Sequence, residues 1–204
     1  MTPAAFQAHT GISDDTRARL EALVAVLLKW QARINLIGRG TVADIWRRHI
    51  LDSAQLAPLV PVTAETVIDL GSGAGFPGLV LALLGIRGIH LVESDGRKCA
   101  FLREAARITG AAVEIHAVRA EALAPREADA ITARALAPLS DLLDIASPFL
   151  GPHTACIFPK GRGAEQELTV SQKTWMMTVS RFESVTDPEG TILKLEDISR
   201  RHVR

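Results

Sequence analysis

The chain has 204 residues, which fits one domain with modest extensions. Hydrophobic residues make up 48% of the sequence and charged residues 23%, a balance typical of a soluble globular protein with a sizeable core. The formal net charge is zero, so no global positive field indicates a nucleic-acid partner, and any RNA contact must depend on local basic patches.

Two further features of the sequence bear on the cellular compartment of the protein. Cys99 and Cys156 are far apart and form no C-x-x-C pair, which is typical of a reducing compartment without disulfides. The sequence shows no N-terminal apolar signal and no apolar span of about 18 residues, so we expect neither export nor membrane insertion. These features predict a cytoplasmic protein.

Residues 1–62 predict an N-terminal helical cap. Residues 1–12 show no clear helical pattern and are expected to be loosely ordered. Apolar side chains then recur at helical spacing to about residue 33 and predict a helix there. Ser13 or Asp14 can cap its N-terminus. Thr41, with Asp44 three residues later, predicts the start of a second helix, which prolines end.

Strands and helices alternate in residues 63–204, and this alternation predicts an α/β fold with a mostly parallel, doubly wound sheet. The cap is expected to form one compact unit with this part of the chain. The expected strands cover residues 66–70, 89–93, 112–116, 129–133 and 153–158, followed by two strand-like runs near 179–185 and 192–198. Helices are expected at 79–84, about 97–108, from 138 and, less clearly, after 163.

A glycine-dense loop at residues 71–78 follows the first expected strand. Such a loop presents backbone N–H groups and a helix N-terminus at the carboxyl end of a strand, where open α/β sheets bind ligands. Gly73, Gly75 and Gly78 satisfy the dinucleotide pattern G-x-G-x-x-G, which would indicate a nicotinamide-dependent oxidoreductase. A second frame begins at Asp69 and runs through Gly71, Gly73 and Gly75.

The second frame resembles the cofactor loop of class I methyltransferases, which bind S-adenosylmethionine. A carboxylate at Asp69 suits a cofactor that carries an ammonium and a sulfonium centre, whereas it would place negative charge near a pyrophosphate. We therefore favour the methyltransferase frame. Glu93 ends the second strand, where an acidic side chain can bind ribose hydroxyls under either interpretation. Arg134 directly follows the fourth strand and is expected to face the same cleft.

Several motifs together resemble the bacterial RsmG (GidB) family, which methylates guanine N7 in 16S ribosomal RNA. The motifs are Lys29-Trp30, Asn35-Leu36, Arg48-His49-Ile50-Leu51-Asp52-Ser53, Asp69 to Gly78, Arg134-Ala135 and Lys160-Gly161. The resemblance implies a Rossmann-like fold that ends in an antiparallel strand pair. It also implies that the cofactor contacts include Gly71, Phe76, Ala120, Glu121 and Arg134.

The full set of predicted cofactor-binding residues is Asp69, Gly71, Ser72, Gly73, Gly75, Phe76, Glu93, Ala120, Glu121 and Arg134. Guanine N7 carries a free lone pair, so the enzyme needs to align the reactants and needs no general base. We therefore nominate no catalytic residue. The histidines show no metal-ligand spacing such as H-x-x-x-H, and we expect no metal site.

Local basic residues are the candidates for RNA contact. They are Arg39, Arg47, Arg48, His49, Lys160, Arg162 and the basic tail at residues 200–204. We expect them to flank the mouth of the cleft and to contact phosphates. The expected partner is 16S ribosomal RNA, within the small subunit or an assembly intermediate, and a monomer is expected. Besides the oxidoreductase, a module that binds ribosomal RNA without catalysis is an alternative that methyl transfer in vitro would exclude.

Overall fold

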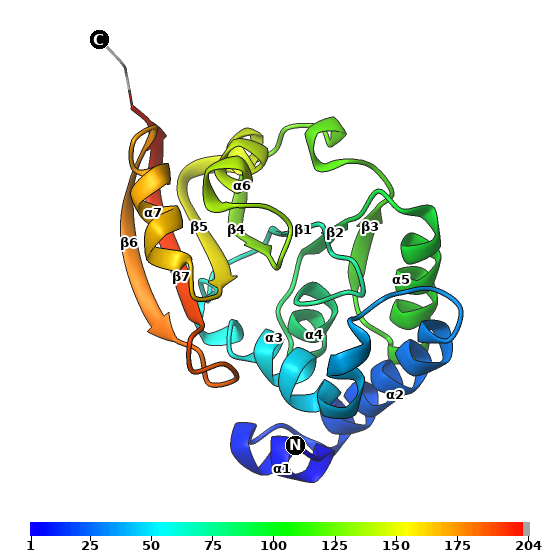
Figure 1. The fold of residues 1–204 in the computed structure, drawn as a ribbon. Coiled ribbons are helices and arrows are strands. Elements are labelled where there is room, and N and C mark those ends of the chain that lie inside the picture. Colours follow the sequence, from blue (N-terminus) through cyan, green and yellow to red (C-terminus); the bar gives the residue numbers. More distant parts are fainter. Residues whose placement is uncertain (202–204) are drawn as a thin grey trace.

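The computed structural model describes residues 1–201, and in them seven strands form one mixed sheet with helices on both faces (Figure 1). The strands are β1 (Val67–Leu70), β2 (Ile89–Val92), β3 (Val113–His116), β4 (Ala128–Ala133), β5 (Leu150–Lys160), β6 (Trp175–Glu183) and β7 (Thr191–Arg200). Their order across the sheet is β3-β2-β1-β4-β5-β7-β6. The first five are parallel, and β7 pairs antiparallel with both β5 and β6. The predicted α/β fold, with its antiparallel final pair, is confirmed.

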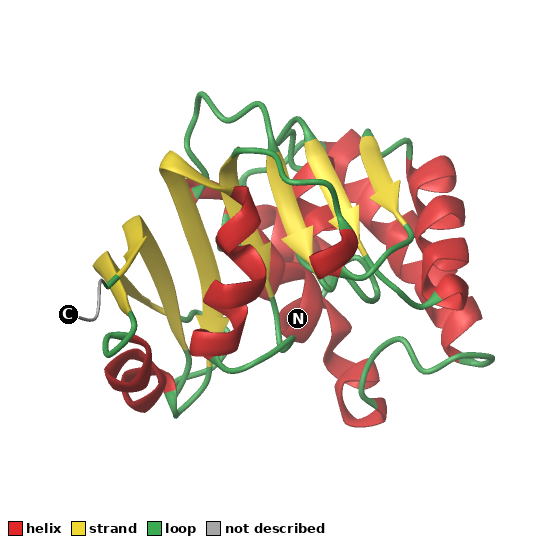
Figure 2. Ribbon diagram, turned by 90° about the horizontal axis from the view of Figure 1, so that it is seen from above, coloured by secondary structure: helices red, strands yellow, loops and turns green. Residues whose placement is uncertain are grey.

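Helices cover the sheet in two groups, and Figure 2 shows helices in front of and behind the strands. The helices are α1 (Pro3–Thr10), α2 (Asp14–Gln31), α3 (Asp52–Ala54), α4 (Gly78–Leu83), α5 (Gly96–Thr109), α6 (Leu139–Ala146) and α7 (Ala164–Ser171). Side chains of the cap pack with those of α4 and α5 in one apolar cluster. A second cluster joins β4, β5 and β7 to α6 and α7 on the opposite face. Within residues 1–201, no helix combines the length and apolar character that a membrane span requires.

The central strand β1 is buried along its whole length, as its apolar sequence predicts for a strand inside a parallel sheet. Its neighbours are aligned so that Leu70 lies beside Val92 of β2 and Ala133 of β4. The residues that follow these three strands therefore emerge at one edge of the sheet. This register brings the glycine loop, Glu93 and Arg134 together.

Residues 1–12 differ from the expectation of a loose segment, because residues 3–10 form helix α1. Thr2 caps this helix by accepting a hydrogen bond from the backbone N–H of Ala5, and Pro3 occupies its first turn. Phe6 is fully buried and lies against Trp46, with ring centroids 5.6 Å apart. One buried aromatic side chain thus anchors a helix that lacks a clear apolar stripe.

The second cap helix is also less regular than predicted. Residues Arg39–Asp44 form a 3₁₀ turn, Trp46–Leu51 form a π-helical turn, and α3 completes the segment. The expected capping pair does not form, because the hydroxyl of Thr41 donates to the carbonyl of Gly38 and Asp44 pairs with the N-terminal amine. π-Helical turns are rare in proteins, and those that occur often lie at functional sites. This one carries His49.

Candidate cofactor and substrate cavity

The glycine loop leaves the carboxyl end of β1 with a tightly folded backbone. Gly73 and Gly75 have φ values of +55° and +81°, in the left-handed region that glycine adopts without strain. A Cβ at Gly75 would also collide with the side chain of Leu79, whereas a Cβ at Gly73 would meet no side chain within 4 Å. Gly73 therefore presents bare backbone toward open space, which lets a ligand approach the loop closely.

Asp69 lies beneath this loop and supports it. The side chain is fully buried, its Oδ1 accepts a hydrogen bond from Thr132 Oγ1 at 2.9 Å, and its Oδ2 accepts one from the backbone N–H of Gly78 at 3.2 Å. Burial raises the pKa of this carboxyl from 3.8 to about 6, because desolvation outweighs these hydrogen bonds. The carboxylate thus connects β1, β4 and the start of α4.

Glu93 fixes the other side of the loop. Its Oε2 accepts a hydrogen bond from the N–H of Gly73 at 2.9 Å, and its Oε1 accepts one from the N–H of Asp95 at 2.8 Å. The ammonium of Lys98 lies 4.0 Å from the same carboxylate. A carboxylate has about four lone-pair positions, so Glu93 can still accept hydrogen bonds from a ligand.

Two adjoining cavities open at this edge of the sheet. The larger cavity, of about 780 Å³, lies among the cap, the glycine loop, residues 134–138 and the ends of β5 and β7. The smaller cavity, of about 290 Å³, lies beside Glu93 and residues 118–121. Gly71, Lys98 and Arg134 line both, so the two cavities meet at the loop. Together they offer room for a nucleoside-sized ligand and a second reactant.

Arg134 connects the sheet to the cap across the larger cavity. Its guanidinium donates to the carbonyl of Arg48, pairs with Asp52 at 3.2 Å and lies 2.8 Å from Nδ1 of His49. The guanidinium also lies over the ring of Phe76, 5.3 Å from its centroid. Arg134 thus faces the cleft, as expected. The hydrogen bonds that it makes to the cap could not be predicted from the sequence.

His49 is held as a neutral ring in the cavity wall. It stacks on Phe76 with centroids 5.1 Å apart, and its Nε2 lies 2.7 Å from the hydroxyl of Thr41. Burial, followed by the positive charges of Arg134 and Arg48, lowers the pKa of His49 from 6.5 to about 4. A neutral imidazole at this position can shape the cavity without adding positive charge.

The predicted cofactor residues fall into three groups in the structure. Ser72, Gly73 and Phe76 line the larger cavity alone, Glu93, Ala120 and Glu121 line the smaller one alone, and Gly71 and Arg134 line both. Asp69, which lies beneath the loop, and Gly75, which is a buried residue of the loop, line neither cavity. The structure thus gives Asp69 a supporting position beneath the loop, and its contact with a cofactor stays a prediction.

The predicted RNA residues are more scattered. Arg48, His49 and Lys160 line the larger cavity, whereas Arg39, Arg47 and Arg162 do not. Lys160 is partly buried, pairs with Glu167 at 2.8 Å and donates to the carbonyl of Ala137 at 2.9 Å. Arg162 pairs with Glu189. Residues 202–204 of the basic tail lie outside the described residues.

Several residues of the site carry no signal that a single sequence could show. Thr132 donates to Asp69 from the neighbouring strand, and Asp52 binds both Arg134 and the hydroxyl of Thr186. Ala135 adopts a φ of +52°, which is strained for a residue with a Cβ, and lines both cavities. Each of these features depends on contacts between residues far apart in the chain.

Comparisons with known proteins agree on one family. The family model described as rRNA small subunit methyltransferase G (GidB) matches residues 16–193. A relative from Paramagnetospirillum magneticum, named ribosomal RNA small subunit methyltransferase G, is 55% identical over 200 residues, which cover 98% of each chain.

Solved structures of methyltransferases share the fold. A putative O-methyltransferase from Klebsiella pneumoniae matches with a TM-score of 0.64 over 96% of each chain, at 13% identity. The TYW2 protein of M. jannaschii, solved in complex with AdoMet, matches with a TM-score of 0.60 over 83% of this chain and 80% of that one, at 12% identity.

Proposed function

Since this chain belongs to the GidB family of small-subunit ribosomal RNA methyltransferases, we propose that it transfers a methyl group from S-adenosylmethionine to N7 of one guanine in 16S ribosomal RNA. The observation that carries this proposal is the glycine loop with Glu93 beside it, at the meeting point of two cavities. One cavity can hold the cofactor while the other admits a base.

The smaller cavity suits the nucleoside end of the cofactor. Glu93 retains free lone pairs for ribose hydroxyls, and residues 120–121 lie at the cavity wall, where a backbone N–H can bind the adenine edge. Gly73 leaves bare backbone at the larger cavity, where the methionine end would lie, and Gly71 lines the junction of the two cavities. When bound, S-adenosylmethionine supplies a methyl group activated by a sulfonium.

The chemistry of the larger cavity matches an acceptor that needs no deprotonation. Guanine N7 has a free lone pair, so the protein has to hold the base in line with the methyl group and to exclude other orientations. The neutral ring of His49, stacked on Phe76, and the guanidinium of Arg134 form a flat, rigid wall at this point. Such a wall can position a purine by stacking and hydrogen bonding.

We further propose that the protein works as a monomer in the cytoplasm, on RNA within the small subunit or an assembly intermediate. The larger cavity supports the RNA part of this proposal, because it opens between the cap and the C-terminal strands and so can admit one flipped nucleotide of a large RNA. A nicotinamide-dependent oxidoreductase is not favoured, since the family match is to methyltransferases and β7 inserts antiparallel between β5 and β6.

The test separates cofactor binding from methyl transfer. Calorimetric titration with S-adenosylmethionine and, in parallel, with NAD is expected to show binding of the first alone. Methylation is then assayed on naked 16S ribosomal RNA and on small subunits isolated from a strain that lacks the enzyme, and mass spectrometry of the digested RNA locates the product. Binding of NAD alone, or cofactor binding without methylation of either RNA substrate, would overturn the proposal.

A further inference from the structure

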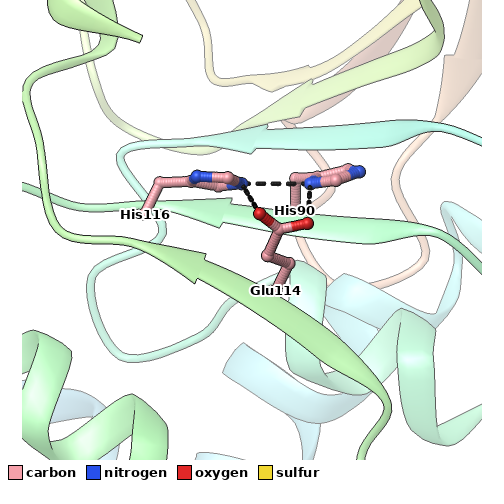
Figure 3. A group of neighbouring side chains, drawn as sticks. All are labelled: His90, Glu114 and His116. Atoms are coloured by element: carbon pink, nitrogen blue, oxygen red, sulfur yellow. Dashed lines mark hydrogen bonds and ion pairs between the residues drawn. The ribbon is translucent and has the colours of Figure 1, made fainter.

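Three potential metal ligands meet away from the glycine loop, on strands β2 and β3 at one end of the sheet. Nδ1 of His90 lies 3.0 Å from Nε2 of His116, and the carboxylate of Glu114 lies 3.3 Å from the first nitrogen and 3.4 Å from the second. Figure 3 shows the carboxylate directed at the gap between the two imidazole rings. The methyltransferase chemistry proposed above uses none of these residues.

The sheet register brings the three side chains together. His90 is the direct partner of Glu114 on the neighbouring strand, and His116 follows Glu114 by two residues, so all three point to the same face of the sheet. In the sequence, Glu114 and His116 are separated by one residue, and His90 lies 24 residues before Glu114. The expectation of no metal site rested on spacing within the sequence, which cannot show a cluster built across two strands.

The spacing of the donor atoms matches a transition-metal site. In a tetrahedral zinc site with metal–ligand bonds of about 2.0–2.1 Å, neighbouring donor atoms are roughly 3.3–3.4 Å apart, because each tetrahedron edge is about 1.63 bond lengths. The two imidazole nitrogens are 3.0 Å apart, close to that edge. Glu114 places one carboxylate oxygen against each of them, Oε2 at 3.3 Å from Nδ1 of His90 and Oε1 at 3.4 Å from Nε2 of His116. Two imidazoles and one carboxylate also form a ligand set typical of zinc.

The surroundings leave a route for an ion to enter. Each histidine side chain is 13% exposed and that of Glu114 is 60% exposed, so the donor atoms lie just below the surface. A neutral imidazole carries its proton on one nitrogen only, so both histidines can turn an unprotonated nitrogen toward the carboxylate, and the three groups can then hold a cation among them. The guanidinium of Arg126, 3.5 Å from Nδ1 of His90, opposes a metal ion at the same place.

We propose that His90, Glu114 and His116 form a site for a borderline divalent transition metal such as Zn²⁺, with its fourth position open to solvent. The ion would bridge β2 to β3, which pairs with no other strand in residues 1–201. The backbone N–H of Glu93 donates to the carbonyl of His116 at 3.1 Å, so the site also adjoins the cavity described above. The expected effect is a fastened edge strand beside the smaller cavity.

The test uses the full chain without a polyhistidine tag, after removal of metals with a chelator. Calorimetric titration with ZnCl₂ is expected to show one bound ion per chain, and Co²⁺ is expected to give the intense visible absorption of a four-coordinate site. Mg²⁺, which prefers oxygen ligands, is expected neither to bind nor to compete. Saturating Zn²⁺ should also raise the melting temperature, because it binds only the folded chain.

Variants separate this site from adventitious binding. His90→Gln, His116→Gln and Glu114→Gln are each expected to weaken Zn²⁺ binding by at least roughly tenfold and to abolish the thermal shift. His153→Gln, which changes an exposed histidine on β5, should bind like the unaltered protein. Arg126→Gln removes the opposing charge and is expected to tighten binding severalfold.

Circular dichroism and titration with S-adenosylmethionine verify that each variant is folded. If folded wild-type protein binds no Zn²⁺, the cluster holds only protons and hydrogen bonds, and the proposal is wrong. Binding that survives in all three ligand variants would likewise overturn it, by placing the ion elsewhere. Neither result would affect the proposed methyl transfer, which is measured separately.

Discussion

The carboxyl of Asp69 gives the glycine loop a pH dependence that can be measured. Its pKa is raised from 3.8 to about 6 by burial, so the folded state binds this proton more tightly than the unfolded chain. The contribution of Asp69 to the free energy of unfolding is therefore fully present below about pH 4 and is lost as pH rises through about 6. Ionisation at neutral pH costs the folded state on the order of 3 kcal/mol.

Asp69→Asn is expected to remove this dependence, because an amide of the same size can bind Thr132 and Gly78 without titrating. Urea unfolding at about pH 4 and about pH 7 should show that the stability of the variant relative to wild type rises with pH. Thr132→Val deletes a hydrogen bond that lowers the pKa of Asp69, and so should move the transition to higher pH. Equal pH profiles for wild type and Asp69→Asn would contradict the assignment.

Glu93→Gln tests the proposed ribose contact at the smaller cavity. The amide can replace only one of the carboxylate oxygens that bind Gly73 and Asp95, and it cannot make charge-assisted hydrogen bonds to hydroxyls. Losing such bonds costs about 1.5–3 kcal/mol, which corresponds to roughly ten- to a hundredfold weaker binding of S-adenosylmethionine. Calorimetry measures the affinity, and Glu65→Gln, an exposed change before β1, serves as the matched control.

At the scale of single residues, the sequence identifies positions better than orientations. Glu93 and Arg134 were predictable because each directly follows a strand, and parallel strands bring their carboxyl ends to one edge. The orientation of Asp69 was not predictable, because Thr132, which donates a hydrogen bond to it, lies 63 residues away in the sequence. The bond between Arg134 and Asp52 spans 82 residues and also depends on the folded cap.

At the scale of elements, helix α1 shows how one side chain can stabilise a segment. Phe6 is fully buried against Trp46, and truncating a buried phenylalanine leaves a cavity that costs about 3–5 kcal/mol. We expect Phe6→Ala to lower the free energy of unfolding by this amount in urea. Phe182→Ala on β6, where the side chain is 38% exposed, should cost clearly less.

The same experiment tests whether the cap and the sheet fold as one unit, as we propose. Cap residues Leu20 and Leu27 share an apolar cluster with Leu79 and Phe101 of α4 and α5. Because this cluster crosses the expected boundary near residue 62, Phe6→Ala should shift a single unfolding transition. A separate early transition of the cap, seen by tryptophan fluorescence, would show that the cap unfolds independently.

The elements themselves were predictable where a periodic pattern was long. Helix α2 and the parallel strands follow from apolar runs and caps, and their positions differ from expectation by a few residues. Helix α1 was not predictable, because eight residues with one buried side chain carry no periodicity. The π-helical turn at His49 was also beyond prediction, since the contacts of His49 with Thr41, Phe76 and Arg134 form only in the folded protein.

At the scale of the whole molecule, a net charge of zero means that RNA binding must depend on where the charges lie. The cap carries three exposed arginines, Arg39, Arg47 and Arg48, of which only Arg48 lines the larger cavity. Within residues 1–201, Arg48 pairs with Asp187 and the other two have no ion pair. Lys160 is a poorer test of phosphate contact, because its removal would leave Glu167 without its ion-pair partner.

Replacing Arg39, Arg47 and Arg48 together with glutamine should therefore weaken binding to 16S ribosomal RNA and make it less sensitive to salt. Each phosphate contact to single-stranded RNA contributes about 0.7 to the slope of log affinity against log salt, so the slope should fall by about 2. The matched control replaces Arg87, Arg103 and Arg107, three exposed arginines on α5 and before β2. Filter binding at several KCl concentrations measures both slopes. Equal slopes for the two variants would mean that total charge, and no patch on the cap, attracts the RNA.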